Sequence, residues 1–167
     1  MNDRWPAPGG LALVQSLVNT LDIETGADSL DGAEGRAGFG VPEGELERAR
    51  ELRESLRAAL LAHAGHPPHG TVTPLGELLA RAPLVVTVDV GDGSAALAPA
   101  DEGPLLSRVA AAVAQALVEG TWTRLKACEA VDCHWAYYDR SPAGRGRWCS
   151  MQVCGARAKM RRYRAKD

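Results

Sequence analysis

The cysteines of this chain constrain its fold more than any other feature. All four lie in the C-terminal quarter as two Cys-x4-Cys pairs, Cys128 with Cys133 and Cys149 with Cys154, separated by fifteen residues. Structural zinc takes four tetrahedral ligands, and four thiolates leave no position open for water. We therefore predict a structural zinc site at these four residues, with free thiols or a redox disulfide as alternatives. His134 adjoins Cys133, which makes it an awkward replacement ligand.

The composition is that of a soluble globular protein, with 46% apolar and 24% charged residues. The first ten residues lack a basic start followed by an apolar run, which argues against a signal peptide. The most apolar stretch, residues 105–118, contains Arg108 and Gln115 and is too short to span a membrane. We expect a cytoplasmic protein without membrane contact, and in that compartment paired cysteines favour metal over disulfide.

The residues before the cysteines predict a mainly helical domain with one β-hairpin. Apolar residues recur with helical spacing, and segments rich in Gly and Pro separate the periodic stretches. Charged residues, among them Arg53 and Arg57, occupy the other faces of the second helix, and residues 25–42 are expected to form a loop. The expected helices are 11–23, 43–63, 74–81 and 102–127, and the expected strands are 84–90 and 94–98.

The cysteine segment predicts a smaller module with its own hairpin. Residues 135–138 and 147–149 are expected to pair as strands, and a helix is expected to begin at Cys154. An apolar stripe on this helix would pack on the hairpin. The segment has little core, so metal is expected to hold it together. The residues of the expected stripe are Ala156, Met160 and Tyr163.

Together these elements predict an α+β chain of two parts. The first is a helical domain over residues 1–123, and the second is a treble-clef-like zinc finger over residues 124–167. Charge divides in nearly the same place, with a net charge of −9 over residues 1–120 and +7 over residues 121–167. Such a division indicates contact with a polyanion, or docking of the basic part on the acidic one. The expected nucleic-acid contacts are Arg145, Arg147, Arg157, Lys159, Arg161, Arg162 and Arg164.

Other polar residues give weaker signals. Asn19 either lines a ligand-binding cavity or bonds with the backbone at a helix end, and both interpretations stay open. His63, His66 and His69 recur at every third position, but a Pro-Pro pair interrupts them, so a surface loop is expected there. No nucleophile–base set is recognisable, and we expect a binding protein rather than an enzyme.

The segment from Cys128 to Arg164 resembles the bacterial CGNR zinc fingers. The resemblance rests on both Cys-x4-Cys pairs, on Arg147-Trp148-Cys149-Ser150-Met151, and on Cys154-Gly155 followed by Arg157. Residues 11–123 resemble, more loosely, the ABATE domain that usually precedes such a finger, through Val18-Asn19-Thr20, the hairpin and the long helix. Two positions depart from the family pattern: Ala156 replaces the signature asparagine, and Gly146 stands where the family often has arginine.

This resemblance implies a zinc-holding transcriptional regulator, with the finger on DNA and the front domain as sensor of a small-molecule effector or a stress signal. The replacement of the asparagine by Ala156 implies loss of a helix cap or base contact, with the metal ligands untouched. A homodimer fits this role because single small fingers rarely reach specific affinity alone. An RNA- or ribosome-associated zinc module and a protein–protein adaptor are the alternative functions.

Overall fold

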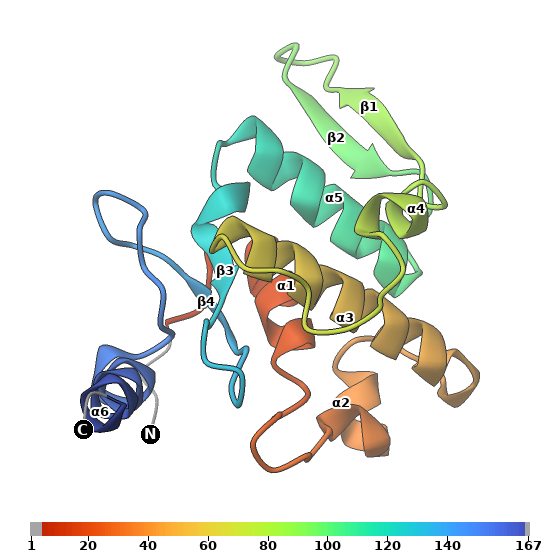
Figure 1. Cartoon of the computed structure of the whole chain (residues 1–167). Coiled ribbons are helices and arrows are strands. Elements are labelled where there is room, and N and C mark those ends of the chain that lie inside the picture. The colour runs from red at the N-terminus through yellow and green to blue at the C-terminus, as the bar shows by residue number, and fades with distance from the viewer. Residues whose placement is uncertain (1–4, 166–167) are drawn as a thin grey trace.

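Four of the helices pack around one apolar core, to which one of the two small β-hairpins also contributes side chains (Figure 1). A computed structural model describes residues 5–165 and shows the predicted α+β fold. Among these residues no helix is long and apolar enough to cross a membrane. The helices are α1 Leu11–Val18, α2 Ala33–Ala37, α3 Leu46–His63, α4 Leu75–Leu79, α5 Leu105–Val118 and α6 Ala156–Arg164. The strands are β1 Leu84–Val88, β2 Ala95–Pro99, β3 Leu125–Ala127 and β4 Ala136–Tyr138.

The core is built from aliphatic side chains of α1, α3 and α5, as the helical spacing predicts. Leu17, Leu56, Leu60 and Val109 are completely buried. Each such side chain contributes about 2 kcal/mol by leaving water. The three helices pack directly on one another, and α4 closes the far side of α3 and α5.

Two antiparallel hairpins flank this core. Strands β1 and β2 form the predicted hairpin, in which Val86 lies opposite Leu97, and they project from the helices beside α5 (Figure 1). Strands β3 and β4 pair with Lys126 opposite Tyr137. The predicted pairing of residues 135–138 with 147–149 is therefore wrong, because the partner strand precedes the first cysteine. Leu125 and Ala136 have no exposed surface and join the helical core.

The helix predicted for residues 102–127 is too long. Gly120 has a φ of +69°, in the left-handed region that favours glycine, and it ends the helix just after Val118. A short 3-10 turn, Trp122–Arg124, then leads into β3. The glycine turn therefore leaves residues 125–127 available for strand pairing.

The first helix and the loop after it also differ from the prediction. Helix α1 ends at Val18, where the hydroxyl of Thr20 donates to the carbonyl of Leu17 at 2.8 Å. The expected loop 25–42 contains a 3-10 turn and the short helix α2. Asp28 starts this structure by accepting a hydrogen bond from the backbone of Leu30, which is fully buried. Helix-capping groups, invisible to periodicity, thus decide both boundaries.

Candidate metal centre and basic surface

The four cysteines converge on one point in the structure. Their sulfur atoms all lie within 4.8 Å of one another, and every thiol is free. The sulfur of Cys149 lies 3.7 Å from that of Cys133 and 3.6 Å from that of Cys154. Four sulfurs placed about 2.3 Å from a central ion would be about 3.8 Å apart. The donor set and its spacing therefore fit one tetrahedral metal ion.

Backbone hydrogen bonds bring the first pair of ligands into place. The amide of Cys128 donates to the carbonyl of Trp135 at 3.0 Å, which extends the β3–β4 pairing by one step. The amide of Cys133 donates to the carbonyl of Ala130 at 2.9 Å and closes a tight turn. The first Cys-x4-Cys pair is thus the end of a hairpin whose strands are buried in the helical core.

The second pair frames the start of α6. Cys149 lies in a loop, and Cys154 lies in the wide helical turn Met151–Gly155 that runs directly into α6. The hydroxyl of Ser150 accepts a hydrogen bond from the amide of Val153 at 3.3 Å and caps this turn. A metal ion held by Cys154 would therefore fix both the position and the rotation of the basic helix.

The electrostatics of the cluster favour a bound cation. Contacts with the thiols of Cys133 and Cys149 lower the pKa of Cys128 to about 4, so one thiolate is stable there. Hydrogen bonding to Cys128 and Cys133 raises the pKa of Cys149, and burial raises the pKa of Cys154. Full deprotonation of the set then requires a positive ion at the centre. The cluster is thus a candidate metal site by its chemistry as well as its geometry.

His134 does not belong to the cluster that could hold metal. It has a φ of 45°, unusual for a residue other than glycine, and its Nδ1 lies 3.0 Å from the carbonyl oxygen of Cys128. Its own carbonyl accepts a hydrogen bond from Arg57 at 2.9 Å. His134 therefore shapes the turn between Cys133 and β4 and connects it to α3.

Arg57 links three parts of the chain and is a residue that the sequence analysis misplaced. Predicted on a charged face of α3, it is completely buried. Besides bonding His134, it donates to the carbonyl of Val18 at 2.9 Å and to a carboxylate oxygen of Glu54 at 3.0 Å. Burial lowers its pKa, and Glu54 opposes that shift. A buried charge with this many partners is costly to disturb, so Arg57 is a structural connection between helices and finger.

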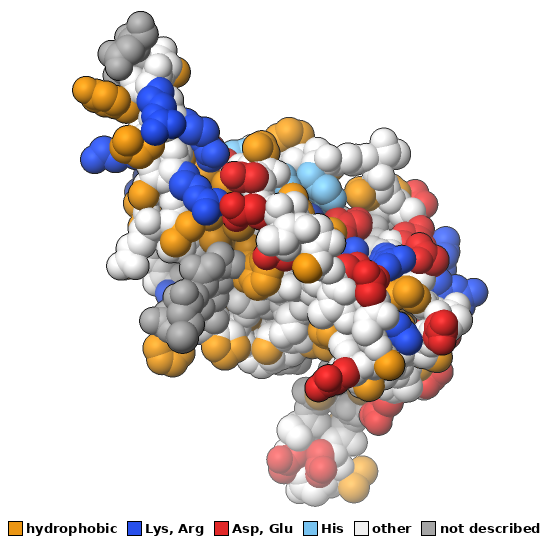
Figure 2. Space-filling view, turned by 90° about the horizontal axis from the view of Figure 1, so that it is seen from below, with side chains coloured by type: hydrophobic (Ala, Val, Ile, Leu, Met, Phe, Trp, Pro, Cys, Tyr) orange, Lys and Arg blue, Asp and Glu red, His pale blue; other side chains and the backbone are white. Residues whose placement is uncertain are grey.

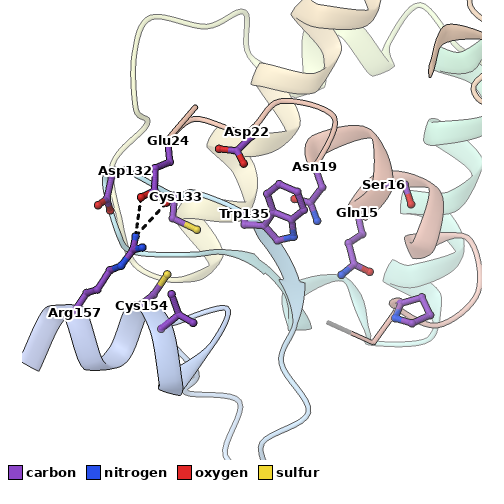
Figure 3. Close-up of a pocket in the computed structure, with 12 residues that line it drawn as sticks. Gln15, Ser16, Asn19, Asp22, Glu24, Asp132, Cys133, Trp135, Cys154 and Arg157 are labelled. Carbon is purple, nitrogen blue, oxygen red and sulfur yellow. Dashed lines mark hydrogen bonds and ion pairs between the residues drawn. The ribbon is translucent and has the colours of Figure 1, made fainter. Parts of the chain in front are cut away.

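Asn19 makes a second connection. Its side-chain amide donates to the carbonyl of Ala136 at 2.9 Å, and its carbonyl oxygen accepts from the amide of Ala136 at 2.7 Å. The side chain thus completes the backbone pairing of β4 from the end of α1. Asn19 also lines a cleft of about 540 Å³ between the helices and the finger, together with Asp22, Trp135 and Arg157 (Figure 3).

A buried ion pair stiffens the loop before Cys149. Lys126 donates to a carboxylate oxygen of Asp139 at 2.9 Å, and the amides of Ser141 and Gly146 donate to the same carboxylate. Although burial opposes the charge, these hydrogen bonds hold the pKa of Asp139 well below its usual range. A Cβ at Gly146 would lie only 2.9 Å from Asp139. An arginine could not occupy position 146 without moving this loop.

Three of the seven predicted nucleic-acid contacts form ion pairs within the chain. Arg157 lies 3.1 Å from Glu24, Arg161 lies 3.6 Å from Asp132, and Arg147 binds both carboxylate oxygens of Glu129. These pairs involve exposed arginines. The other four predicted contacts are exposed, and within residues 5–165 no ion pair engages them: Arg145, Lys159, Arg162 and Arg164.

Helix α6 packs on the finger through a different face from the predicted one. Met160 and Tyr163 are 52% and 69% exposed, whereas Ala158 is buried near Ala130 and Trp148. The prediction that an apolar stripe with Met160 and Tyr163 packs on the hairpin is wrong because Cys154 sets the rotation of the helix. As a result, basic and apolar side chains gather together on the projecting helix (Figure 2).

The three histidines at the end of α3 and in the loop after it do not converge on one point. His63 donates from Nδ1 to the carbonyl of Leu125 at 2.7 Å and makes an edge-to-face contact with Trp122. His69 bonds Glu54 at 2.8 Å, and His66 lies 3.5 Å from Glu129. His63 therefore adds a third link between the helices and the finger, after those of Arg57 and Asn19.

Two family models match the chain. The CGNR zinc finger model matches residues 124–167, and the ABATE model, whose description is "Putative stress-induced transcription regulator", matches residues 11–120. No curated protein matches the sequence. The ABATE match covers more than half of the chain, and the two families occur in the order expected from the sequence. The chain therefore belongs to the ABATE family and carries a CGNR zinc finger in residues 124–167.

Proposed function

We propose that this chain is a DNA-binding transcriptional regulator whose finger holds zinc and lays α6 against the phosphate backbone. The observation that carries the proposal is the exposed basic surface of α6, which begins two residues after a candidate metal ligand. Zinc is the ion of choice because four thiolates at tetrahedral spacing suit it and leave no catalytic position. The protein then acts in the cytoplasm as a binding protein and not as an enzyme.

The basic side chains would serve DNA binding in two groups. Lys159, Arg162 and Arg164 have no ion-pair partner among the described residues and can meet phosphates directly. Arg157 and Arg161 must first exchange a carboxylate for a phosphate. This exchange costs little because exposed ion pairs are weak.

The position of Ala156 bears on sequence preference. It is the first residue of α6, it is exposed, and it is not one of the four clustered cysteines. An asparagine there would face solvent or DNA and could bond a base edge. We therefore expect this chain to bind duplex DNA with the backbone contacts intact and with a weaker sequence preference than an Ala156→Asn variant.

The cleft between helices and finger is our proposed place for an effector. It combines the aromatic ring of Trp135 with the polar side chains of Asn19 and Asp22 and reaches Arg157 of the basic helix (Figure 3). A small molecule bound there would touch both parts of the chain. Thermal shift measurements against a panel of metabolites test this proposal. Asp22→Ala alters the cleft and should reduce the stabilisation by any metabolite that binds there. An equal shift in the wild type and in Asp22→Ala would show that the metabolite binds elsewhere.

Fluorescence anisotropy of the zinc-loaded protein tests the main proposal. The probes are duplex DNA from its own upstream region, random duplex and single-stranded RNA, each over a salt series. Binding to duplex DNA should weaken as salt is added: log K should fall linearly with the logarithm of the salt concentration, with a slope of about 0.9 for each phosphate neutralised. Arg162→Ala with Lys159→Ala should reduce both affinity and slope, whereas Arg48→Ala, an exposed arginine on α3, should change neither.

Two outcomes would favour the other functions. Preferential binding of single-stranded RNA would indicate an RNA-associated zinc module. Absence of binding to all three probes at physiological salt would overturn nucleic-acid binding by the protein alone and favour an adaptor whose finger meets an acidic protein.

A further inference from the structure

The β1–β2 hairpin carries the most exposed apolar surface of the helical part. Val86, Val88 and Val90 are 68%, 61% and 103% exposed, and the strand Leu84–Val88 contains no charged residue. A two-stranded hairpin is marginally stable by itself in water, whereas a sheet of three or more strands with an apolar face is stable. An apolar hairpin that projects from the molecule therefore lacks the further strands that would stabilise it.

The hydrogen bonds show which edge of the hairpin is open. The amide of Ala100 donates to the carbonyl of Pro83, and the amide of Asp89 donates to the carbonyl of Ser94. Hydrogen-bonded positions alternate along an antiparallel strand, so residues 85 and 87 bond to β2. The backbone groups of Leu84, Val86 and Val88 consequently point to the other edge of β1. Among the described residues no further strand pairs with that edge.

The open edge of β1 lacks the features that usually prevent a further strand from pairing with it. Proteins usually protect an edge strand with lysine, proline, a bulge or a covering element. None of these side chains occurs between Leu84 and Val88, and helix α5 packs mainly against β2. By contrast, β2 ends in Pro99, which cannot donate to a further strand. The unprotected edge of β1 is thus the position at which a strand can be added.

We propose that β1 pairs with β1 of a second copy of this chain across a two-fold axis at Val86, forming a four-stranded sheet. Antiparallel pairing about Val86 sets Leu84 of each copy opposite Val88 of the other and joins all the outward backbone groups. It also places Asp89 of one copy opposite Pro83 of the other, two residues from Arg81, which is exposed. Opposite charges then meet at both ends of the pairing.

Charge also selects the antiparallel direction. A parallel partner would align the two Asp89 carboxylates, whereas the two-fold arrangement separates them to opposite ends of the sheet. Like charges placed opposite each other destabilise strand pairs. The two-fold arrangement is self-complementary, as closed dimers require. Antiparallel pairing of two copies about Val86 therefore fits this edge better than parallel pairing of the same two copies.

The dimer surface is independent of the basic surface. Figure 1 places the β1–β2 hairpin and α6 at opposite ends of the molecule. Pairing through β1 would leave both copies of α6 exposed, so the inference goes beyond the proposed function and does not rest on it. If the chain binds DNA, the dimer would offer two basic helices to one duplex.

Sedimentation velocity of the zinc-loaded full chain over a concentration series tests the inference. The wild type should show a concentration-dependent dimer. Val86→Lys should weaken association about tenfold or more, because it places two like charges on the two-fold axis. Val131→Lys is the matched control, since Val131 is 78% exposed on the finger. A wild type that stays monomeric up to its solubility limit, or a Val86→Lys variant that dimerises like the wild type, overturns the proposal.

Two further variants separate edge pairing from a general loss of folding. Val86→Pro removes an outward-facing amide without removing a hydrogen bond to β2, and an edge strand tolerates proline at such a position, so the variant should keep the wild-type circular dichroism spectrum and lose the dimer. Val86→Cys should form an intermolecular disulfide on mild oxidation, because paired residues on the axis lie at disulfide distance. Thr87→Cys, one residue off the axis, should cross-link much less. Equal cross-linking of both cysteine variants would contradict the two-fold at Val86.

Discussion

The helical part of the chain and its finger are held together by different means. The first has a continuous core of buried leucine, valine and alanine from α1, α3 and α5. Within the described part of the finger, the separate buried cluster consists of Cys128, Ala130 and Cys154, and two of these are candidate metal ligands. One part is therefore stabilised by burial of apolar surface, and the other needs an ion to close it.

The boundary between the part stabilised by apolar burial and the part that needs an ion lies inside the finger. Its hairpin, β3–β4, is buried in the helical core through Leu125 and Ala136. The segment from the loop at Ser141 to the end of α6 contributes no residue to that core, and its buried surface is built around the cysteines instead. The comparison teaches that a bound metal ion would fix the basic helix, whereas burial of apolar side chains fixes the β3–β4 hairpin from which the finger extends.

The largest expected effect comes from breaking the metal site. Cys149→Ser should release zinc and unfold residues 141–164, while β3–β4 and the helices keep their structure. Zinc contributes roughly 10–16 kcal/mol in finger peptides, far more than the small core of this segment can supply. Metal stoichiometry and hydrogen exchange measure both effects.

Met151→Ala is the matched control for the metal site, because Met151 is 71% exposed and lies two residues from Cys149. It should keep full zinc. Stoichiometric zinc in Cys149→Ser would contradict the four-ligand site. Loss of protection throughout the helices would show instead that the two parts unfold as one.

A second large effect is expected at the connection between the two parts. Arg57→Met should lower the free energy of unfolding by about 3 kcal/mol, because it removes one of the cationic partners of half-buried Glu54 and leaves the buried carbonyls of Val18 and His134 without their donor. Urea denaturation measures the loss. Arg48→Met, on the exposed side of the same helix, should cost little, and an equal loss in both variants would show that Arg57 has no special linking role.

Arg57 also shows where sequence reasoning stops. Helical spacing placed α3 correctly, since leucines recurring on one face indicate which side is buried. The same spacing put Arg57 among the solvated charges, because no pattern in α3 reports the carbonyls of Val18 and His134 that it meets in space. A buried charge depends on partners distant in the sequence, and those become visible only when the chain is folded.

In the finger, too, the local pattern predicted some features and contacts distant in the sequence decided others. The spacing of the cysteines was enough to predict which four residues gather, because ligand geometry is local chemistry. The partner strand of β4 and the rotation of α6 were not predictable in the same way. The first depends on the turn at Gly120 that ends α5, and the second on where Cys154 must point. Both are set by neighbours rather than by the propensity of the segment itself.

A smaller effect should follow from pH at the junction of α3 and β3. Burial lowers the folded-state pKa of His63 below its ordinary value of 6.5, so folding favours the neutral ring. The unfolded chain then binds more protons, and this contribution to stability is complete above pH 6.5 and declines as the pH falls below it. His63→Gln should flatten that dependence and cost about 1 kcal/mol at neutral pH through the altered hydrogen bond to Leu125.

Thermal unfolding between pH 7.5 and 5.5 measures this effect. Replacement of His66, which lies in the loop after α3 and beside Glu129, provides the control. An unchanged pH dependence in His63→Gln would mean that another group carries the linkage, and His69 beside Glu54 would be the next residue to replace.

The smallest effect on stability should accompany a change in binding. Glu24→Ala removes the carboxylate that pairs with Arg157, and because both side chains are exposed the free energy of unfolding should stay unchanged. If α6 meets phosphate, the same change should strengthen duplex binding, since Arg157 no longer exchanges partners and a negative charge leaves the surface. Anisotropy at low and physiological salt measures this, with Glu34→Ala on α2 as an exposed acidic control. Equal affinities for Glu24→Ala, Glu34→Ala and the wild type would show that Arg157 does not contact DNA. DNA binding by α6 would then rest on the basic residues without an ion-pair partner, Lys159, Arg162 and Arg164.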